Sequence, residues 1–229
     1  MTGSRVAPVA ALLLDLDGTL VDSEPLHRER YRTWFTRRGW PYDDDVAALF
    51  TGRRADDVFR SVDGPWRGED PAALVADLLA LEPSRTLPEP VAGAAEAVAW
   101  ARAHGIRLAL VTSAGPRWAT RALGALGGIE AFEVTVTRDD VTTGKPDPAC
   151  YALACERLGV LPADCVACED APDGVRSAVA AGVGTVVGVT TSFPGRTLGE
   201  AGAHLTLPDL TTLPATLAPG HPPPTRGRE

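Results

Sequence analysis

Near the N-terminus an apolar run leads into two aspartates, in the sequence Leu12-Leu13-Leu14-Asp15-Leu16-Asp17-Gly18-Thr19-Leu20. Apolar residues 9–14 predict a buried strand that ends at two carboxylates. Residues two apart in an extended chain point the same way, so Asp15 and Asp17 should project together from the strand end. Gly18 then lets the backbone turn away sharply.

Two neighbouring carboxylates have a chemical consequence. Like charges this close repel unless a proton or a cation lies between them. Mg²⁺ suits such a site because it accepts carboxylate oxygens, water and substrate phosphate together. The alternative is a strand that runs into an ordinary acidic Asp-Gly turn, which is a common local structure.

Composition and charge limit the class of protein. The 229 residues, 45% hydrophobic and 23% charged, are ordinary for a soluble globular chain with one large domain or two modest ones. A net charge of -8 argues against a nucleic-acid partner. No apolar run reaches the roughly 20 residues of a membrane-spanning helix, and the N-terminal apolar run leads directly into Asp15 without a cleavage-like segment. We therefore expect a cytoplasmic protein without a membrane partner, as a monomer or weak dimer.

The four cysteines include one C-x-x-C spacing, Cys165 to Cys168, which raises the question of zinc or redox chemistry. No second ligand pair stands at zinc spacing, and Cys150 and Cys155 lie five apart on an expected helix. Strand alternation should turn Cys165 and Cys168 to opposite faces. We interpret all four as small apolar core residues.

The chain has a single lysine, Lys145, among 22 basic residues, and it stands in the run Gly144-Lys145-Pro146-Asp147-Pro148. An ammonium is a compact point charge, whereas a guanidinium is a broad planar fork. A tight site that holds a carboxylate and a phosphate oxygen would admit only the compact group. The retained lysine therefore indicates such a site.

Several apolar runs end in polar residues and alternate with amphipathic helical patterns. The expected strands cover residues 107–111, 134–137, 166–168 and 185–189, and the expected helices cover 93–104, 117–126, 148–158 and 174–181. This alternation predicts an α/β fold with a Rossmann-like parallel sheet flanked by helices. Ligands bind beyond the carboxyl ends of such strands, where the candidate chemical residues all fall.

Residues 22–91 show helical patterns and no strand-like run. Helical patterns cover residues 24–39, 45–50, 56–61 and 72–81, and the chain returns to the core through residues 87–91. We predict an α/β catalytic core formed by residues 1–22 and 92–218, with an inserted α-helical cap of residues 23–91. The proline-rich residues 219–229 are expected to be a disordered tail.

Four motifs together resemble the haloacid dehalogenase superfamily, specifically its phosphatases with a small helical cap. They are DLDGTLVDSEPLH, LALVTSAG, GKPDP and CEDAPDGVRSAVAAG, in order and at plausible spacing over residues 10–215. The resemblance implies that Asp15 is the nucleophile, which takes the phosphoryl group as an aspartyl phosphate. It implies that Asp17 is the general acid and then the base. Mg²⁺ would be held by Asp15, Asp17 through its carbonyl, Asp170 and the adjacent Glu169.

The resemblance also implies a phosphate site. Thr112 would bind phosphoryl oxygens through its hydroxyl, and Ser113 and Ala114 would add backbone N–H groups at a helix N-terminus. Lys145 would neutralise the nucleophile and the phosphate. Three of these residues have a simpler structural interpretation. Thr112 or Ser113 could merely cap the helix that follows them, and Asp170 could cap the helix after it.

Substrate choice should depend on the cap. The run of residues 51–57 resembles the cap loop of sugar- and polyol-phosphate phosphatases, including deoxyglucose-phosphate and glycerol-phosphate types. Arg53 or Arg54 could reach a substrate oxygen, or could remain solvated charges. His27 could face the substrate, or could be an ordinary helix residue.

Two other functions remain as alternatives. A β-phosphoglucomutase-like enzyme shares the core and His27, but such mutases carry an arginine where this chain has Ala55, and they use a cap lysine, whereas Lys145 belongs to the core. A non-catalytic binding module would be expected to have lost Asp15 or Asp17, and both are present. The preferred prediction is Mg²⁺-dependent hydrolysis of a small sugar or polyol phosphate monoester through an aspartyl phosphate on Asp15.

Overall fold

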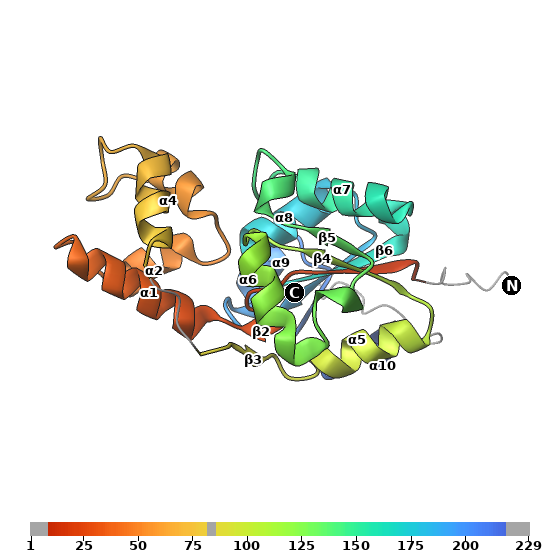
Figure 1. Ribbon diagram of the computed structural model, residues 1–229. Helices are drawn as coiled ribbons and strands as arrows, with labels where there is room; N and C mark the ends of the chain where they lie inside the picture. Colours follow the sequence, from red (N-terminus) through yellow and green to blue (C-terminus); the bar gives the residue numbers. More distant parts are fainter. Residues whose placement is uncertain (1–8, 82–85, 219–229) are drawn as a thin grey trace, which may run out of the picture.

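The computed structural model describes residues 9–81 and 86–218, which form a sheet core and a helical lobe beside it (Figure 1). The predicted tail of residues 219–229 lies outside the described residues. A six-stranded sheet has the order β5-β4-β1-β6-β7-β8, and every neighbouring pair is parallel. Its strands are β1 (Ala11–Leu14), β4 (Arg107–Val111), β5 (Val134–Val136), β6 (Cys165–Glu169), β7 (Thr185–Val189) and β8 (Leu205–Leu207).

Strand β1 lies in the middle of the sheet, and all four of its side chains are buried. Leu12 and Leu14 pack into one apolar cluster, and Ala11 and Leu13 into another, as the alternation of a strand requires. Helices on the first face are α5 (Ala94–Ala103), α6 (Pro116–Ala122) and α10 (Leu213–Leu217). Helices on the second are α7 (Ala149–Leu158), α8 (Pro172–Ala180) and α9 (Gly195–Ala201). The predicted α/β fold is confirmed.

The helical lobe is inserted after the first strand. It contains α1 (Glu24–Arg37), α2 (Asp44–Phe50), α3 (Ala55–Ser61) and α4 (Pro71–Leu79). An aromatic cluster of its own holds the lobe together, because Trp34, Phe35 and Trp66 are almost fully buried within it. Aromatic side chains of this size dominate the burial energy of a small core. The insertion therefore has its own apolar interior, and we call it the cap.

Two short strands connect the cap to the core, and the sequence patterns did not predict them. Strands β2 (Val21–Asp22) and β3 (Glu89–Pro90) pair antiparallel, with Val21 opposite Pro90. Two-residue strands are too short to produce a recognisable period. They hold the outgoing and the returning chain side by side at the junction.

The remaining differences from prediction are local. The expected helix 117–126 ends earlier, because α6 stops at Ala122 and a 3-10 turn covers Leu123–Leu126. The last strand β8 was not predicted. Cys165 and Cys168 lie in the two opposite core clusters, and all four cysteines are buried and free, as expected for core residues. Among the described residues, no helix has the length and apolar character needed to cross a bilayer.

Candidate active site

The carboxyl ends of β1, β4 and β6 bring the predicted residues to one edge of the sheet. Asp15 follows β1 directly, and its backbone N–H donates to the Cys168 carbonyl at 3.1 Å. Gly18 has φ +80, and a Cβ there would overlap the Asp170 carboxylate. The glycine is therefore needed for both the turn and the close approach of the two loops.

Lys145 lies between two buried carboxylates. Its Nζ is 2.6 Å from Asp15 Oδ1 and 2.5 Å from Glu169 Oε1, and it also donates to the Val111 carbonyl at 3.1 Å. The Tyr151 hydroxyl donates to the same Glu169 oxygen at 2.5 Å. The Lys145 side chain is only 4% exposed, so its charge is compensated by protein groups rather than by solvent.

Asp15, Glu169 and Asp170 form an acidic cluster. One carboxylate oxygen of each lies within 4.8 Å of the others. Burial raises the pKa of Asp170 to about 7, and the neighbouring Glu169 charge adds to the shift. Burial likewise raises the pKa of Asp15 well above its ordinary value, against the opposing charge of Lys145. Such carboxylates favour a bound cation or a proton, so the donor set fits a hard divalent ion.

Asp17 has a different environment from Asp15. Its Oδ1 accepts from Ser23 Oγ at 2.5 Å and from Trp118 Nε1 at 2.8 Å, and it lies 2.9 Å from His27 Nε2. Burial alone would raise the pKa of Asp17, but the His27 charge and these hydrogen bonds lower it below its ordinary value. Burial acts to lower the pKa of His27, and the Asp17 charge raises it overall. The two groups thus stabilise each other in the ionised form.

The loop after β4 carries the predicted phosphate-binding residues. Thr112, Ser113 and Ala114 line the same cavity as the carboxylates. The Thr112 hydroxyl accepts from the Ala114 N–H at 3.0 Å, and α6 begins only at Pro116. Thr112 therefore stabilises the turn of its own loop and lines the cavity, but it does not cap α6, whose N-cap residue is Gly115.

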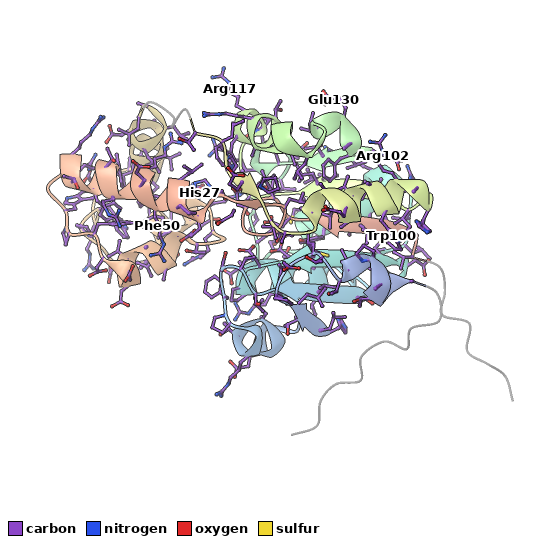
Figure 2. All side chains as sticks on the ribbon, turned by 90° about the horizontal axis from the view of Figure 1, so that it is seen from below. His27, Phe50, Trp100, Arg102, Arg117 and Glu130 are labelled. Atoms are coloured by element: carbon purple, nitrogen blue, oxygen red, sulfur yellow. The ribbon has the colours of Figure 1, made fainter. Side chains whose placement is uncertain are left out.

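A cavity of about 400 Å³ lies between this edge of the sheet and the cap. His27, labelled in Figure 2 where α1 meets the core, lines it together with Asp15 and Lys145. Arg53 and Arg54 line it from the cap loop. All predicted site residues are thus brought to one cavity. The volume is within the range that suits a small organic ligand.

The two cap arginines also bind the core. Arg54 Nη2 donates to the Arg138 carbonyl at 3.1 Å and to the Val141 carbonyl at 3.3 Å. Arg53 Nε lies 3.5 Å from an Asp173 carboxylate oxygen. Both side chains therefore stabilise the contact between cap and core, a role that the sequence patterns did not predict.

Four residues at the site were not among the predicted ones. Trp118 and Ser23 contact Asp17, Tyr151 contacts Glu169, and Ser192 hydrogen-bonds to Asp170. Trp118 is 101 positions from Asp17 along the chain, so no local spacing relates them. Ser23 belongs to the DLDGTLVDSEPLH motif, so its position in the sequence could have indicated that it lies at the site.

Comparison with known proteins identifies the family of the chain. A model of the haloacid dehalogenase-like hydrolase family matches residues 9–182, so the chain belongs to this family. It is 40% identical over 204 residues to the validoxylamine A 7'-phosphate phosphatase of Streptomyces hygroscopicus subsp. limoneus, covering 88% of this chain and 94% of the relative. It is 34% identical over 206 residues to a phosphorylated carbohydrates phosphatase of Thermotoga maritima, covering 84% and 91%.

A solved structure extends the comparison to the fold. The crystal structure of a mutant CbbY from Rhodobacter sphaeroides in complex with xylulose-(1,5)bisphosphate superimposes with a TM-score of 0.74 at 28% identity. The alignment covers 90% of this chain and 96% of CbbY. Family, relatives and fold together identify the enzyme class as a phosphoric monoester hydrolase.

Proposed function

We propose that the chain hydrolyses the phosphate monoester of a small sugar or polyol, with Mg²⁺ and through an aspartyl phosphate on Asp15. The observation that carries this proposal is the buried contact of 2.6 Å between Asp15 and Lys145 beside a cluster of carboxylates in a cavity. The names of the two phosphatase relatives support a phosphorylated carbohydrate as substrate.

In the first step an Asp15 oxygen forms a bond to phosphorus, and the bond between phosphorus and the substrate alcohol oxygen breaks. Asp17 gives its proton to the departing alcohol. The low pKa of Asp17 means that it is ionised in the free enzyme, and an arriving phosphate dianion would raise that pKa and favour protonation. In the second step Asp17 takes a proton from water, whose oxygen bonds to phosphorus and releases Asp15.

Three kinds of group would neutralise the transferring phosphoryl group. The Lys145 ammonium is already in place beside Asp15. Thr112, with the backbone N–H groups of Ser113 and Ala114, would bind phosphoryl oxygens once the loop accommodates the ligand. Preorganised donors of this kind supply most of the catalysis in phosphoryl transfer.

The carboxylates of Asp15 and Asp170 and the main-chain carbonyl of Asp17 would hold Mg²⁺. Glu169 would add negative charge, although one of its oxygens already accepts from Lys145 and Tyr151. The ion, when bound, supplies a Lewis acid that offsets charge on the phosphoryl oxygens.

The cap would select the substrate. We propose that His27, Arg53 and Arg54 lie next to the sugar, in addition to the contacts that they already make within the protein. Hydrolysis is preferred to mutase activity because position 55 is alanine and the single lysine is used at Asp15. An arginine would replace a cap lysine only imperfectly.

The test is phosphate release from hexose, pentose, polyol and glycolate phosphates, with Mg²⁺ and with EDTA, using Asp15→Asn as the blank. The same samples are followed for conversion of β-glucose 1-phosphate to glucose 6-phosphate. Mg²⁺-dependent release from one or a few sugar phosphates supports the proposal. Isomer conversion without release would establish a mutase instead.

A further inference from the structure

One oxygen of Asp17 has three neighbouring donors, and they come from both parts of the protein. Ser23 directly precedes α1, and His27 lies on that cap helix. Trp118 instead lies on α6 in the core, where it packs against the apolar cluster of that face. Its indole N–H donates to Asp17 Oδ1 at 2.8 Å. No hydrogen bond reaches Oδ2 of Asp17 from any residue in the ranges 9–81 and 86–218.

We propose that Trp118 is a positioning residue for Asp17, and that it aims the second carboxylate oxygen at the leaving group. This inference rests on the proposed function, because it assigns Asp17 the transfer of a proton to the substrate alcohol. All three contacts converge on Oδ1, so they fix the plane of the carboxylate and leave Oδ2 available. A carboxylate that must move a proton needs such a fixed geometry within hydrogen-bond reach of the reacting oxygen.

The chemistry of the indole suits this role better than that of the other two donors. A tryptophan N–H donates and cannot accept, so it cannot take a proton from Asp17. A hydroxyl or an imidazole, in contrast, can act either as a donor or as an acceptor. The Trp118 ring is also held in place by its packing and by an edge contact with His27, with ring centroids 5.2 Å apart at 60°.

The position of Trp118 in the core gives its contact a second property. The His27 contact joins the cap to Asp17, so it depends on the distance between cap and core. The Trp118 contact joins two parts of the core, so it does not depend on the distance between cap and core. Asp17 therefore has one donor whose alignment does not depend on where the cap lies.

The test compares Trp118→Phe with the wild type on two substrates. Fructose 1-phosphate has an alcohol leaving group that needs a proton, whereas p-nitrophenolate leaves without one. The ratio kcat/KM reports only steps up to departure of the leaving group. We expect Trp118→Phe to lower kcat/KM for fructose 1-phosphate by about tenfold and to leave that for p-nitrophenyl phosphate nearly unchanged.

Trp100→Phe is the matched control, because Trp100 lies on α5 and packs against the same apolar cluster without lining the cavity (Figure 2). It should leave both ratios unchanged. A second comparison adds Trp118→Phe to Asp17→Asn. If Trp118 acts through Asp17, the double variant should be no slower on fructose 1-phosphate than Asp17→Asn alone.

Three results would overturn the inference. These are an equal loss on both substrates, no loss on fructose 1-phosphate, or a further loss in the Asp17→Asn background. Retained activity on p-nitrophenyl phosphate also shows that the variant is folded. If the wild type releases phosphate from no sugar or polyol phosphate of the panel, the proposed function falls together with the inference. If fructose 1-phosphate alone is not hydrolysed, the panel member with the highest kcat/KM takes its place in the comparison. If the wild type hydrolyses both substrates and Trp118→Phe matches it, only the inference falls.

Discussion

Lys145 donates to Asp15 across 2.6 Å from a position 130 residues further along the chain. The contact joins the loop after β5 to the end of the central strand β1. It is buried, and Glu169 on the next strand accepts from the same ammonium. A buried cation with two carboxylate partners is expensive to disturb, because removal of one partner leaves an uncompensated charge.

Lys145→Arg should lower kcat by roughly two orders of magnitude although it keeps the charge. The reason is space, since the ammonium is nearly fully buried between Asp15, Glu169 and the Val111 carbonyl. A planar guanidinium would displace one of them. Steady-state kinetics measure the effect, and Arg196→Lys at an exposed ion pair is the control that should change nothing. Near-normal turnover of Lys145→Arg would contradict the need for a compact charge.

Gly144→Ala should raise KM about tenfold, because it weakens the contact between the cap and the core. A Cβ at Gly144 would lie 2.8 Å from Arg54 Cδ and Nε, so the side chain that joins the cap to the core must shift. Gly124→Ala is the matched control, because nothing lies within 4 Å of a Cβ there. Equal kinetics for the two variants would mean that the Arg54 contact does not influence substrate binding.

Asp140→Asn should cost about 1 kcal/mol of unfolding free energy at pH 7 and less at pH 3. Burial acts to raise the pKa of Asp140, but hydrogen bonds from Thr137 and Arg157 lower it overall. A depressed folded pKa gives stability that is present above the ordinary value of 3.8 and is lost as the pH falls through the folded value. Urea unfolding at the two pH values measures the difference.

The neighbouring carboxylate is the control for this comparison. Asp139 is 61% exposed, and Asp139→Asn should change stability little at either pH. If Asp140→Asn were equally destabilising at both pH values, the stabilisation would not come from the ionised form of the Asp140 carboxylate.

Mg²⁺ affinity should rise with pH through about 7, because the ion must displace a proton from Asp170. The pKa of this buried carboxyl is raised to about 7, so the group is largely protonated below that pH. Isothermal titration calorimetry in buffers of different ionisation enthalpy measures both the affinity and the proton released. Asp170→Asn should weaken Mg²⁺ binding and reduce the number of protons released on binding, whereas Asp209→Asn, at a residue outside the cluster and the cavity lining, should change neither. An affinity for Mg²⁺ that does not change with pH would contradict the assignment of Asp170 as a ligand that must lose a proton.

The parts of the fold that follow from local pattern were predicted, and the parts that follow from tertiary contact were not. Residues 12–14, 108–111 and 166–168 form unbroken apolar runs, which buried parallel strands require, so the strand ends and Asp15, Thr112 and Asp170 could be placed. The contact of Trp118 with Asp17 has no local signature. Tyr151 reaches Glu169 from a helix whose apolar pattern would be the same without that contact.

The cap shows the same limit. Its helices could be predicted because each has its own period, but where they rest on the core could not. The sequence therefore left open whether Arg53 or Arg54 reaches a substrate oxygen or remains a solvated charge. The carbonyl partners of Arg54 and the carboxylate partner of Arg53 came only from the structure. The pairing of β2 with β3 also depends on residues far apart in the chain.

Trapping the phosphoryl enzyme tests directly whether Asp15 is the nucleophile. The wild type is mixed with radiolabelled sugar phosphate in the presence of Mg²⁺, quenched in acid within milliseconds, digested, and its peptides are mapped for label. We expect an acyl phosphate, released by hydroxylamine, on the peptide that contains Asp15, and no label in Asp15→Asn. Label on another side chain, or turnover without any labelled peptide, would contradict this role of Asp15.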